Sequence, residues 1–367
     1  MSQSPFLDRS GWTPEPLDLW EPILITKEEI DAEIERLASI ARPANGRRQS
    51  LIVHPRWNEL GVGPGLNPGV RVTLEVLKPG EETTPIRHNS TQINFCIKGS
   101  GSTIINGKRI KYGLYDTWNF PSMATYRHIN DSNDLHVRFC YSNAPLLEKL
   151  NVHIVEDAPQ EPPLHVVEEK EEAKAQESIA KIVPLGDEGA FLMPYEVLIN
   201  PEPVESKILH WPWQGLKGEL DKLGGLDKNY RGRRLYMMWN PATGRHNGIT
   251  PNFFATITIR PAGIVDRPHR HTSAAINYYF QGSGHSVVEK KRYDWKAGDL
   301  MLSAPGWGIH NHASHDEPVY ELTVQDQPLM IYMESLLWQE DLKKPWRVLG
   351  TEAGFETNAE ALKRKAS

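Results

Sequence analysis

The sequence predicts a mainly β protein that is built from two jelly-roll barrels with flanking helices. The chain contains two copies of one pattern, TPIRHNSTQINFCIKGSG at residues 84–101 and RPHRHTSAAINYYFQGSG at residues 267–284. Each copy alternates short β-prone runs with glycine-containing turns, which is typical of antiparallel barrels. With 367 residues, the chain is also long enough for two domains.

The two copies keep one register over many positions, which indicates a duplication. His88 corresponds to His271, 183 residues later, and Asp116 corresponds to Asp299 at the same separation. Short runs that predict strands precede and follow each glycine turn: VRVTLEVL, INFCI and STIIN in the first copy, and FFATITI, INYYF and HSVVE in the second.

Helices are expected outside the barrels. The segment TKEEIDAEIERLASIA begins with Thr26 as N-cap and places Ile30, Ile34 and Leu37 on one face. A charged, alanine-rich segment predicts a solvated helix at residues 168–180, and MESLLWQEDLKK predicts a further helix after the second barrel.

Composition changes and the repeat divide the chain into five segments. We expect an N-terminal arm and helix at residues 1–50 and a first barrel at residues 51–150. A linker with a helix is expected at 151–205, a second barrel at 206–345, and a C-terminal tail at 346–367.

Charge and composition disfavour several classes of function. The formal net charge is −6 and the chain has no block of Lys and Arg, so nucleic-acid binding is not expected. Two cysteines, Cys96 and Cys140, do not make a disulfide framework. The chain shows no signal-peptide pattern and no apolar run of about 18 residues, so we expect a cytoplasmic protein without membrane attachment.

Two histidines one residue apart are the strongest functional signal. Residues i and i+2 of a strand project from the same face, so His269 and His271 can offer two nitrogens to one metal ion inside a barrel. A neighbouring strand must supply the third ligand, and GDLMLSAPGWGIHNHAS offers His310 and His312. The alternative is that these are surface or hydrogen-bonded histidines.

The first copy predicts a degenerate site. Ile86 occupies the position of His269, and Tyr126 lies five residues after Pro121, as His310 lies five after Pro305. His88 and His128 remain, and we expect them to be packed or hydrogen-bonded. One metal ion per chain is expected, in the second barrel.

These spacings resemble the two motifs of the cupin superfamily, whose histidines hold a divalent metal. Many cupins add a glutamate four residues after the second histidine, where this chain has Ala275, with Gln92 at the equivalent position of the first copy. The expected ligand set is therefore three neutral histidines. Imidazoles suit Fe(II), Zn, Cu, Ni or Co better than Mg or Ca.

The segment from Asn240 to Ser314 resembles the gentisate 1,2-dioxygenase and salicylate dioxygenase group of bicupins. This resemblance implies a non-haem Fe(II) dioxygenase that cleaves the ring of a hydroxylated aromatic compound with O₂. It implies that His269, His271 and His310 hold the iron and that His312 contacts the substrate hydroxyl or transfers protons. It also implies a homodimer or homotetramer.

Two departures from that group bear on the substrate. Members that cleave carboxylated rings usually carry an arginine where this chain has Asn277, and their active iron usually lies in the first barrel. Asn277, Tyr279 and Gln281 share strand parity with the histidines, so we expect them to face the interior as neutral hydrogen-bonding groups.

Other candidates for substrate binding have structural alternatives. Arg233 and Arg234 can serve as anion partners or lie on the surface, and Trp307 can line the pocket or pack in the core. Asp326 lies where the related enzymes have an Asp-x-Pro stretch, and a turn-capping role is also expected for it.

Two other functions compete with the dioxygenase hypothesis. The same barrel can serve a metal-dependent isomerase, lyase or hydrolase that uses Zn, Ni or Mn as a Lewis acid. The chain can also be a non-catalytic binding or storage bicupin whose histidines have no reaction to perform. Metal content and O₂ uptake discriminate between the three.

Overall fold

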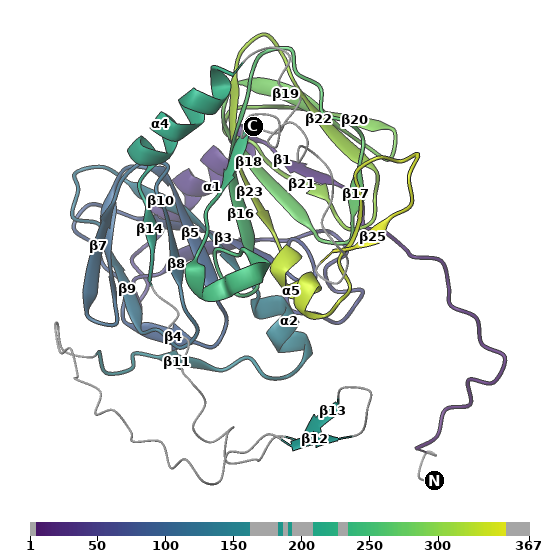
Figure 1. Ribbon diagram of the computed structural model, residues 1–367. Helices are drawn as coiled ribbons and strands as arrows, with labels where there is room; N and C mark the ends of the chain where they lie inside the picture. The colour runs from purple at the N-terminus through teal and green to yellow at the C-terminus, as the bar shows by residue number, and fades with distance from the viewer. Residues whose placement is uncertain (1–4, 162–182, 186–189, 193–207, 227–233, 350–367) are drawn as a thin grey trace.

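The computed structural model of this protein describes residues 5–161, 183–185, 190–192, 208–226 and 234–349. Its strands form two β barrels, one from the purple and blue half of the chain and one from the green and yellow half (Figure 1). The helix expected at residues 168–180 lies outside the described residues, as does residue 350 onward of the expected tail.

The first barrel contains a six-stranded and a five-stranded antiparallel sheet. The large sheet has the order β14 (His210–Trp211), β8 (Thr117–Phe120), β5 (Gln92–Lys98), β10 (His136–Ser142), β3 (Arg71–Leu77) and β2 (Arg48–Ile52). The small sheet has the order β11 (Val155–Asp157), β4 (Ile86–His88), β9 (Tyr126–Ile129), β6 (Gly101–Ile105) and β7 (Lys108–Tyr112). Helix α2 (Ala144–Lys149) follows β10.

The second barrel repeats this plan. Its large sheet has the order β1 (Ile23–Ile25), β21 (Leu300–Ala304), β18 (Ala275–Gln281), β23 (Val319–Gln325), β16 (Phe254–Arg260) and β15 (Leu235–Met237). Two three-stranded sheets complete it, one with β20 (Lys291–Lys296), β19 (Ser283–Val288) and β22 (His310–Ser314), the other with β17 (Arg270–His271), β24 (Leu337–Gln339) and β25 (Arg347–Val348).

Two short helices and one hairpin lie outside the sheets of the barrels. The 3₁₀ helix η1 (Pro241–His246) and helix α5 (Gln327–Tyr332) belong to the second half of the chain. Strands β12 (Val183–Leu185) and β13 (Ala190–Leu192) pair with each other. Among the described residues, no helix is both long enough and apolar enough to cross a membrane.

The repeated glycine turn is required by the backbone. The first glycine of each GSG triplet has a positive φ, 71° at Gly99 and 82° at Gly282, a region that other residues seldom adopt. The hairpins that follow keep the same register in both barrels, since Ser102 pairs with Lys111 and His285 pairs with Asp294. The duplication seen in the sequence is therefore also a duplication of strand pairing.

The two large sheets share one hydrophobic core. Tyr278 of β18 meets Phe95 of β5 edge-on at 5.9 Å between ring centroids and Phe139 of β10 at 5.2 Å. Ile276 also belongs to this core, whereas Asn277 faces the interior of the second barrel. Both faces of β18 are thus buried, which explains why its sequence is almost continuously apolar.

The barrels exchange edge strands. Strand β1, which precedes the first barrel in sequence, pairs with β21 of the second, and β14, which precedes the second barrel, pairs with β8 of the first. Each strand leads into a helix that packs on the barrel that follows it: α1 (Lys27–Ser39) contacts β2 and β3, and α4 (Trp213–Gly224) contacts β15 and β16. We propose that the chain is organised in the five segments predicted from the sequence. The exception is that β1 and β14 each pair with the barrel that their own segment does not contain.

The duplicated aspartates secure this exchange. The Oδ1 atom of Asp299 accepts the backbone N–H of Lys27, the first residue of α1, at 2.7 Å. In the same way, Oδ1 of Asp116 accepts the N–H of Trp213, the first residue of α4, at 2.7 Å. A carboxylate at a helix N-terminus satisfies a backbone donor and interacts favourably with the helix dipole.

One expected helix is present and another is absent. Helix α1 has a capping box between Thr26 and Glu29 and buries Ile30, Ile34 and Leu37, as predicted. The helix predicted for MESLLWQEDLKK is wrong, because α5 ends at Tyr332 and this segment contains strand β24 instead. Pairing of β24 with β17 and β25 outweighs the local helix propensity. Helix α4 was not anticipated.

Candidate metal centre and active site

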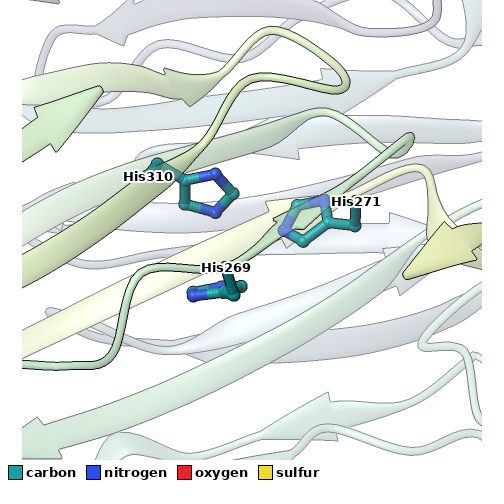
Figure 2. A group of neighbouring side chains, drawn as sticks. All are labelled: His269, His271 and His310. Carbon is teal, nitrogen blue, oxygen red and sulfur yellow. The ribbon is translucent and has the colours of Figure 1, made fainter. Parts of the chain in front are cut away.

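Three histidines converge on one point inside the second barrel. His269 precedes β17, His271 ends it, and His310 begins β22 (Figure 2). One side-chain nitrogen from each lies within 4.8 Å of the others, and all three residues are buried. The backbones of His269 and His310 hold each other through two hydrogen bonds, at 3.0 and 2.9 Å. The strand pairing therefore supplies the third nitrogen beside the first two.

Backbone carbonyls orient the three rings. The Nδ1 atoms of His269, His271 and His310 lie 3.0, 2.9 and 2.9 Å from the carbonyl oxygens of Arg267, Ser273 and Gly308. Because a carbonyl only accepts a hydrogen bond, each Nδ1 carries the hydrogen and each Nε2 carries the lone pair. This is the tautomer that a metal ligand needs. The donor set therefore fits a transition-metal ion.

An aromatic side chain supports two of these rings. Trp338 of β24 stacks on His271, with centroids 4.7 Å apart, and on His269 at 5.8 Å. Sequence reasoning missed Trp338, because it assigned this segment to a helix. A strand is recognised in a sequence by the alternation of apolar and polar side chains. Strand β24 has three residues, which are too few to show such an alternation.

A fourth histidine, His312, lies two residues beyond His310 on the same strand and has a different partner. Its Nδ1 lies 2.7 Å from Oγ of Ser286 on β19. Ser286 is fully buried, and its Oγ also accepts the indole N–H of Trp295 at 2.9 Å and lies 3.4 Å from the Tyr279 hydroxyl. Neither Ser286 nor Trp295 was predicted, because no local motif links them to His312.

The four histidines line a cavity of about 420 Å³. Its wall includes Ala275 and Asn277 of β18, as the strand parity predicted. The amide of Asn277 is engaged on both sides, since Nδ2 donates to Thr323 at 2.9 Å and Oδ1 accepts from Ser303 at 2.5 Å. Asn277 is therefore a fixed neutral part of the wall.

Three expected pocket residues do not line the cavity. Tyr279 packs behind the wall with its ring stacked on Trp295, with centroids 3.7 Å apart. Gln281 is exposed, because a register shift between Tyr279 and Gln281 interrupts the strand alternation. Trp307 is half-buried and lies under the guanidinium of Arg270 at 4.4 Å. The predictions for these residues are corrected accordingly.

The cavity contains two arginines. Arg234, which was predicted, lines the cavity, and its Nε donates to the backbone carbonyl of Leu223 at 3.1 Å. Arg233 lies outside the described residues. Arg260 was not predicted, and its guanidinium donates to Glu321 and Asp266 at 3.0 Å each. Burial opposes its charge, but these two carboxylates raise the pKa of Arg260 above its usual value.

Asp326 lies at the start of α5 and fixes the turn between β17 and β18. Its Oδ1 accepts the backbone N–H of Ala274 at 2.8 Å, and burial raises the pKa of this carboxyl to about 6. The equivalent residue of the first barrel, Asn143, accepts the N–H of Thr91 at 3.0 Å in the same way. Asp326 is thus a structural residue at a turn, in line with the alternative kept for it.

The interior of the first barrel is closed by aromatic side chains. Nε2 of His88 lies 2.9 Å from the hydroxyl of Tyr126, the residue found in place of a third histidine, and its Nδ1 contacts the carbonyl of Ser90. Burial lowers the pKa of His88 to about 4. His128 bonds Thr103 through Nδ1 at 2.8 Å. Within the described part of this barrel, no three ligand-type side chains are close enough to share an ion.

The chain is similar in sequence to several known dioxygenases. No protein-family model matches the chain. It is 22% identical over 268 residues to a 5-aminosalicylate 1,2-dioxygenase of Comamonas sp., a match that covers 71% of this chain and 66% of that enzyme, just under two thirds. It is 32% identical over 130 residues to a gentisate 1,2-dioxygenase of Ralstonia sp., covering 34% and 36% of the two chains.

The fold matches that of a solved ring-cleaving enzyme. The structure of a salicylate 1,2-dioxygenase from Pseudaminobacter salicylatoxidans superposes with a TM-score of 0.70 at 16% identity and covers 90% of both chains. The mainly β bicupin fold predicted from the sequence is therefore confirmed. The predicted resemblance to gentisate and salicylate dioxygenases is confirmed as well. Oligomeric state and cellular location stay predictions.

Proposed function

We propose that this protein, which resembles the ring-cleaving bicupin dioxygenases in sequence and fold, cleaves the ring of a hydroxylated aromatic compound with O₂ and uses Fe(II) to do so. The observation that carries the proposal is the group of three buried histidines whose side-chain nitrogens converge at the wall of the cavity. Relatives named for aminosalicylate and gentisate supply the reaction class.

We assign the metal to His269, His271 and His310. Three protein ligands leave positions open for substrate and a small molecule, which catalytic metal sites require. Ferrous iron bound there would supply the electron-transfer chemistry that lets O₂ react with an aromatic ring. Trp338 and the three backbone carbonyls keep the imidazoles in place before any ligand arrives.

The cavity suits one small aromatic molecule. Its volume of about 420 Å³ lies in the lower part of the range usual for small-ligand sites. The neutral amide of Asn277 forms part of the wall, and Arg260 is already matched by two carboxylates. A phenolic or amino-phenolic ring therefore fits better than a ring with several charges. Arg234 is the cation that we assign to a single substrate carboxylate.

We assign to His312 a hydrogen bond to the substrate hydroxyl. Ser286 accepts the Trp295 N–H, so its own hydrogen is available for the 2.7 Å contact with Nδ1 of His312. The other acceptor within reach, the Tyr279 hydroxyl, is farther away at 3.4 Å. With Nδ1 accepting, the hydrogen of a neutral His312 lies on Nε2, which can donate a hydrogen bond to a substrate hydroxyl in the cavity. We therefore assign His312 to orienting the substrate, and the other three histidines to the metal.

Metal analysis followed by O₂ uptake tests the proposed function. The protein, loaded with Fe(II) without air, is expected to consume O₂ with at least one member of a panel of gentisate, salicylates, hydroquinones, catechols and aminophenols. His271→Ala should lose the bound iron and the O₂ uptake. His88→Ala, the matched change in the first barrel, should keep both.

The opposite results are equally specific. If the Fe(II) protein consumes no O₂ with any compound of the panel, the dioxygenase proposal is wrong. Zn, Ni or Mn in the purified protein, together with turnover that ignores O₂, would instead indicate a Lewis-acid enzyme built on the same three histidines.

A further inference from the structure

We propose that the second barrel carries another binding site for a divalent transition-metal ion on its outer surface, formed by His285, Asp294 and His315. These residues lie on the sheet of β20, β19 and β22, on the face opposite the cavity. The proposal is independent of the proposed function, because none of the three residues lines the cavity.

Strand pairing brings the three side chains together. His285 on β19 lies directly opposite Asp294 on β20. His315 follows the last residue of β22, and its backbone N–H donates to the carbonyl of Ser283 at 3.0 Å. One ligand atom of each residue lies within 4.8 Å of the others. The backbone that positions these groups is therefore held by the sheet itself.

The two imidazoles are already in contact. Nδ1 of His285 and Nε2 of His315 are 3.2 Å apart, a hydrogen-bond distance at which one nitrogen must be unprotonated. A metal ion would take the place of the hydrogen between the rings.

The donor set selects the type of ion. Two imidazoles and one carboxylate suit Zn(II), Ni(II) or Cu(II), whereas Mg²⁺ and Ca²⁺ require mostly oxygen ligands. Asp294 is exposed and the two histidines are half-buried, so water can fill the remaining coordination positions.

Alternation along β19 separates this site from the cavity. His285 points outward, and the next residue, Ser286, is fully buried and bonds His312 on the inner side. An ion on the outer face would hold β19, β20 and the end of β22 together. It would thereby stiffen the sheet that carries His310 and His312.

The first barrel has no such set of ligands at the equivalent positions. Ser102 and Lys111 occupy the places of His285 and Asp294 and are paired in the same register. Ser102 donates to Asp131, beyond the end of β9, at 2.8 Å. The fold therefore accepts a serine and a lysine at these places, which makes the changes His285→Ser and Asp294→Lys suitable for a test.

Arg292 binds the carboxylate of Asp294 and would compete with a metal ion for it. Its Nε and one terminal nitrogen donate to Oδ1 of Asp294 at 2.9 and 2.6 Å. Replacement by glutamine removes the positive charge and the ion pair but leaves all three ligands. Arg292→Gln should therefore bind the ion more tightly than the parent protein.

Zinc binding to the full-length protein, followed by competition with a chromophoric chelator, tests the proposal. The parent is expected to bind two ions, and the double variant His285→Ser, Asp294→Lys is expected to bind one fewer. His269→Ala with His310→Ala should remove the other ion and leave the outer one. If the inner histidines bind no zinc, the parent binds one ion and the outer double variant binds none, which still supports the outer site.

Thermal unfolding provides a second measurement and a check of folding. Zinc should raise the Tm of the inner double variant, and adding His285→Ser and Asp294→Lys to that variant should abolish the rise. Should the outer double variant fail to fold, His315→Asn replaces it in the same titration. Equal zinc stoichiometry in the parent and in a folded outer variant would overturn the proposal.

Discussion

The hydrogen-bond partner of Nδ1 divides the four histidines of the cavity into two kinds. Carbonyl oxygens accept from Nδ1 of three of them, with Oγ of Ser273 also 3.0 Å from Nδ1 of His271, whereas a serine hydroxyl contacts Nδ1 of the fourth, His312. The first barrel repeats both arrangements, since His88 contacts the carbonyl of Ser90 and His128 contacts the hydroxyl of Thr103. Equivalent histidines therefore have the same kind of hydrogen-bond partner in both barrels, although the described part of the first barrel lacks a set of three ligands.

Replacement of Ser286 tests the orientation of His312. Ser286→Ala leaves His312 without its hydroxyl partner, and we expect kcat to fall by about 10- to 100-fold with little change in bound metal. Ser286→Thr keeps the hydroxyl, as Thr103 does in the first barrel, and should restore most of the activity. Steady-state kinetics and the ¹⁵N shifts of the His312 ring measure the effect. Equal activity in both variants would contradict the role of the hydroxyl.

His88 gives the protein part of its sensitivity to acid. Burial lowers its pKa to about 4 in the folded state, whereas the unfolded chain titrates near 6.5. Between these values the unfolded state binds more protons, so the free energy of unfolding decreases as the pH falls. The loss attributable to His88 is about 3 kcal/mol when the pH reaches 4.

The change His88→Gln isolates this contribution. Urea unfolding from pH 7 to pH 4 should show a slope reduced by about 1.4 kcal/mol per pH unit relative to the parent. Above pH 7 the difference between the two proteins should be independent of pH, because His88 is then neutral in both states. A slope equal to that of the parent would mean that His88 is not buried in its neutral form.

At the scale of the element, β17, β18 and β22 position most of the site. Ile276 and Tyr278 of β18 face the shared core, and Ala275 and Asn277 line the cavity. The alternation ends at the register shift between Tyr279 and Gln281, which leaves Gln281 exposed. A strand therefore presents its side chains predictably only as far as its pairing stays regular.

The exchanged strands are anchored by two single residues, Asp299 and Asp116. Asp299→Ala removes the acceptor of the Lys27 N–H, and we expect a loss of about 1 kcal/mol in the free energy of unfolding. Asp116→Ala should produce a similar loss, because Asp116 accepts the Trp213 N–H. Chemical unfolding measures both. Asp299→Asn retains an acceptor and should lose less, and an equal loss would indicate that capping is not the cause.

At the scale of the whole molecule, the barrels are joined by a core as well as by exchanged strands. Tyr278 contacts Phe95 and Phe139 across the two large sheets, and helix α1 adds Ile30 and Ile34 to the same cluster. This core is formed by residues of both barrels. The chain is therefore expected to unfold as one unit, although the sequence suggests two domains.

The change Tyr278→Ala tests this cooperativity. Loss of a buried ring should decrease the free energy of unfolding by about 3 to 5 kcal/mol, and Tyr278→Phe should decrease it much less. Tryptophan fluorescence and far-UV circular dichroism should report one coincident transition in each variant. Two separated transitions would show that the barrels are independent.

The sequence by itself determined the duplication, the β class and the group of histidines to which we assign the metal. These features follow from patterns within short segments: a period of two places His269 and His271 on one face, and motif spacing identifies His310. The same local reasoning predicts a degenerate first site from Ile86 and Tyr126, and in the structure the hydroxyl of Tyr126 contacts His88. It failed where a partner lay far away along the chain.

Only the tertiary structure decided which distant residues complete the site. Trp338 reaches the ligand histidines through the pairing of β24 with β17, and Ser286 reaches His312 through the pairing of β19 with β22. The exposure of Gln281 and the exchange of β1 with β14 also depend on strand pairing. Hydrogen bonds between strands join residues without regard to their distance in sequence, so no local pattern records them.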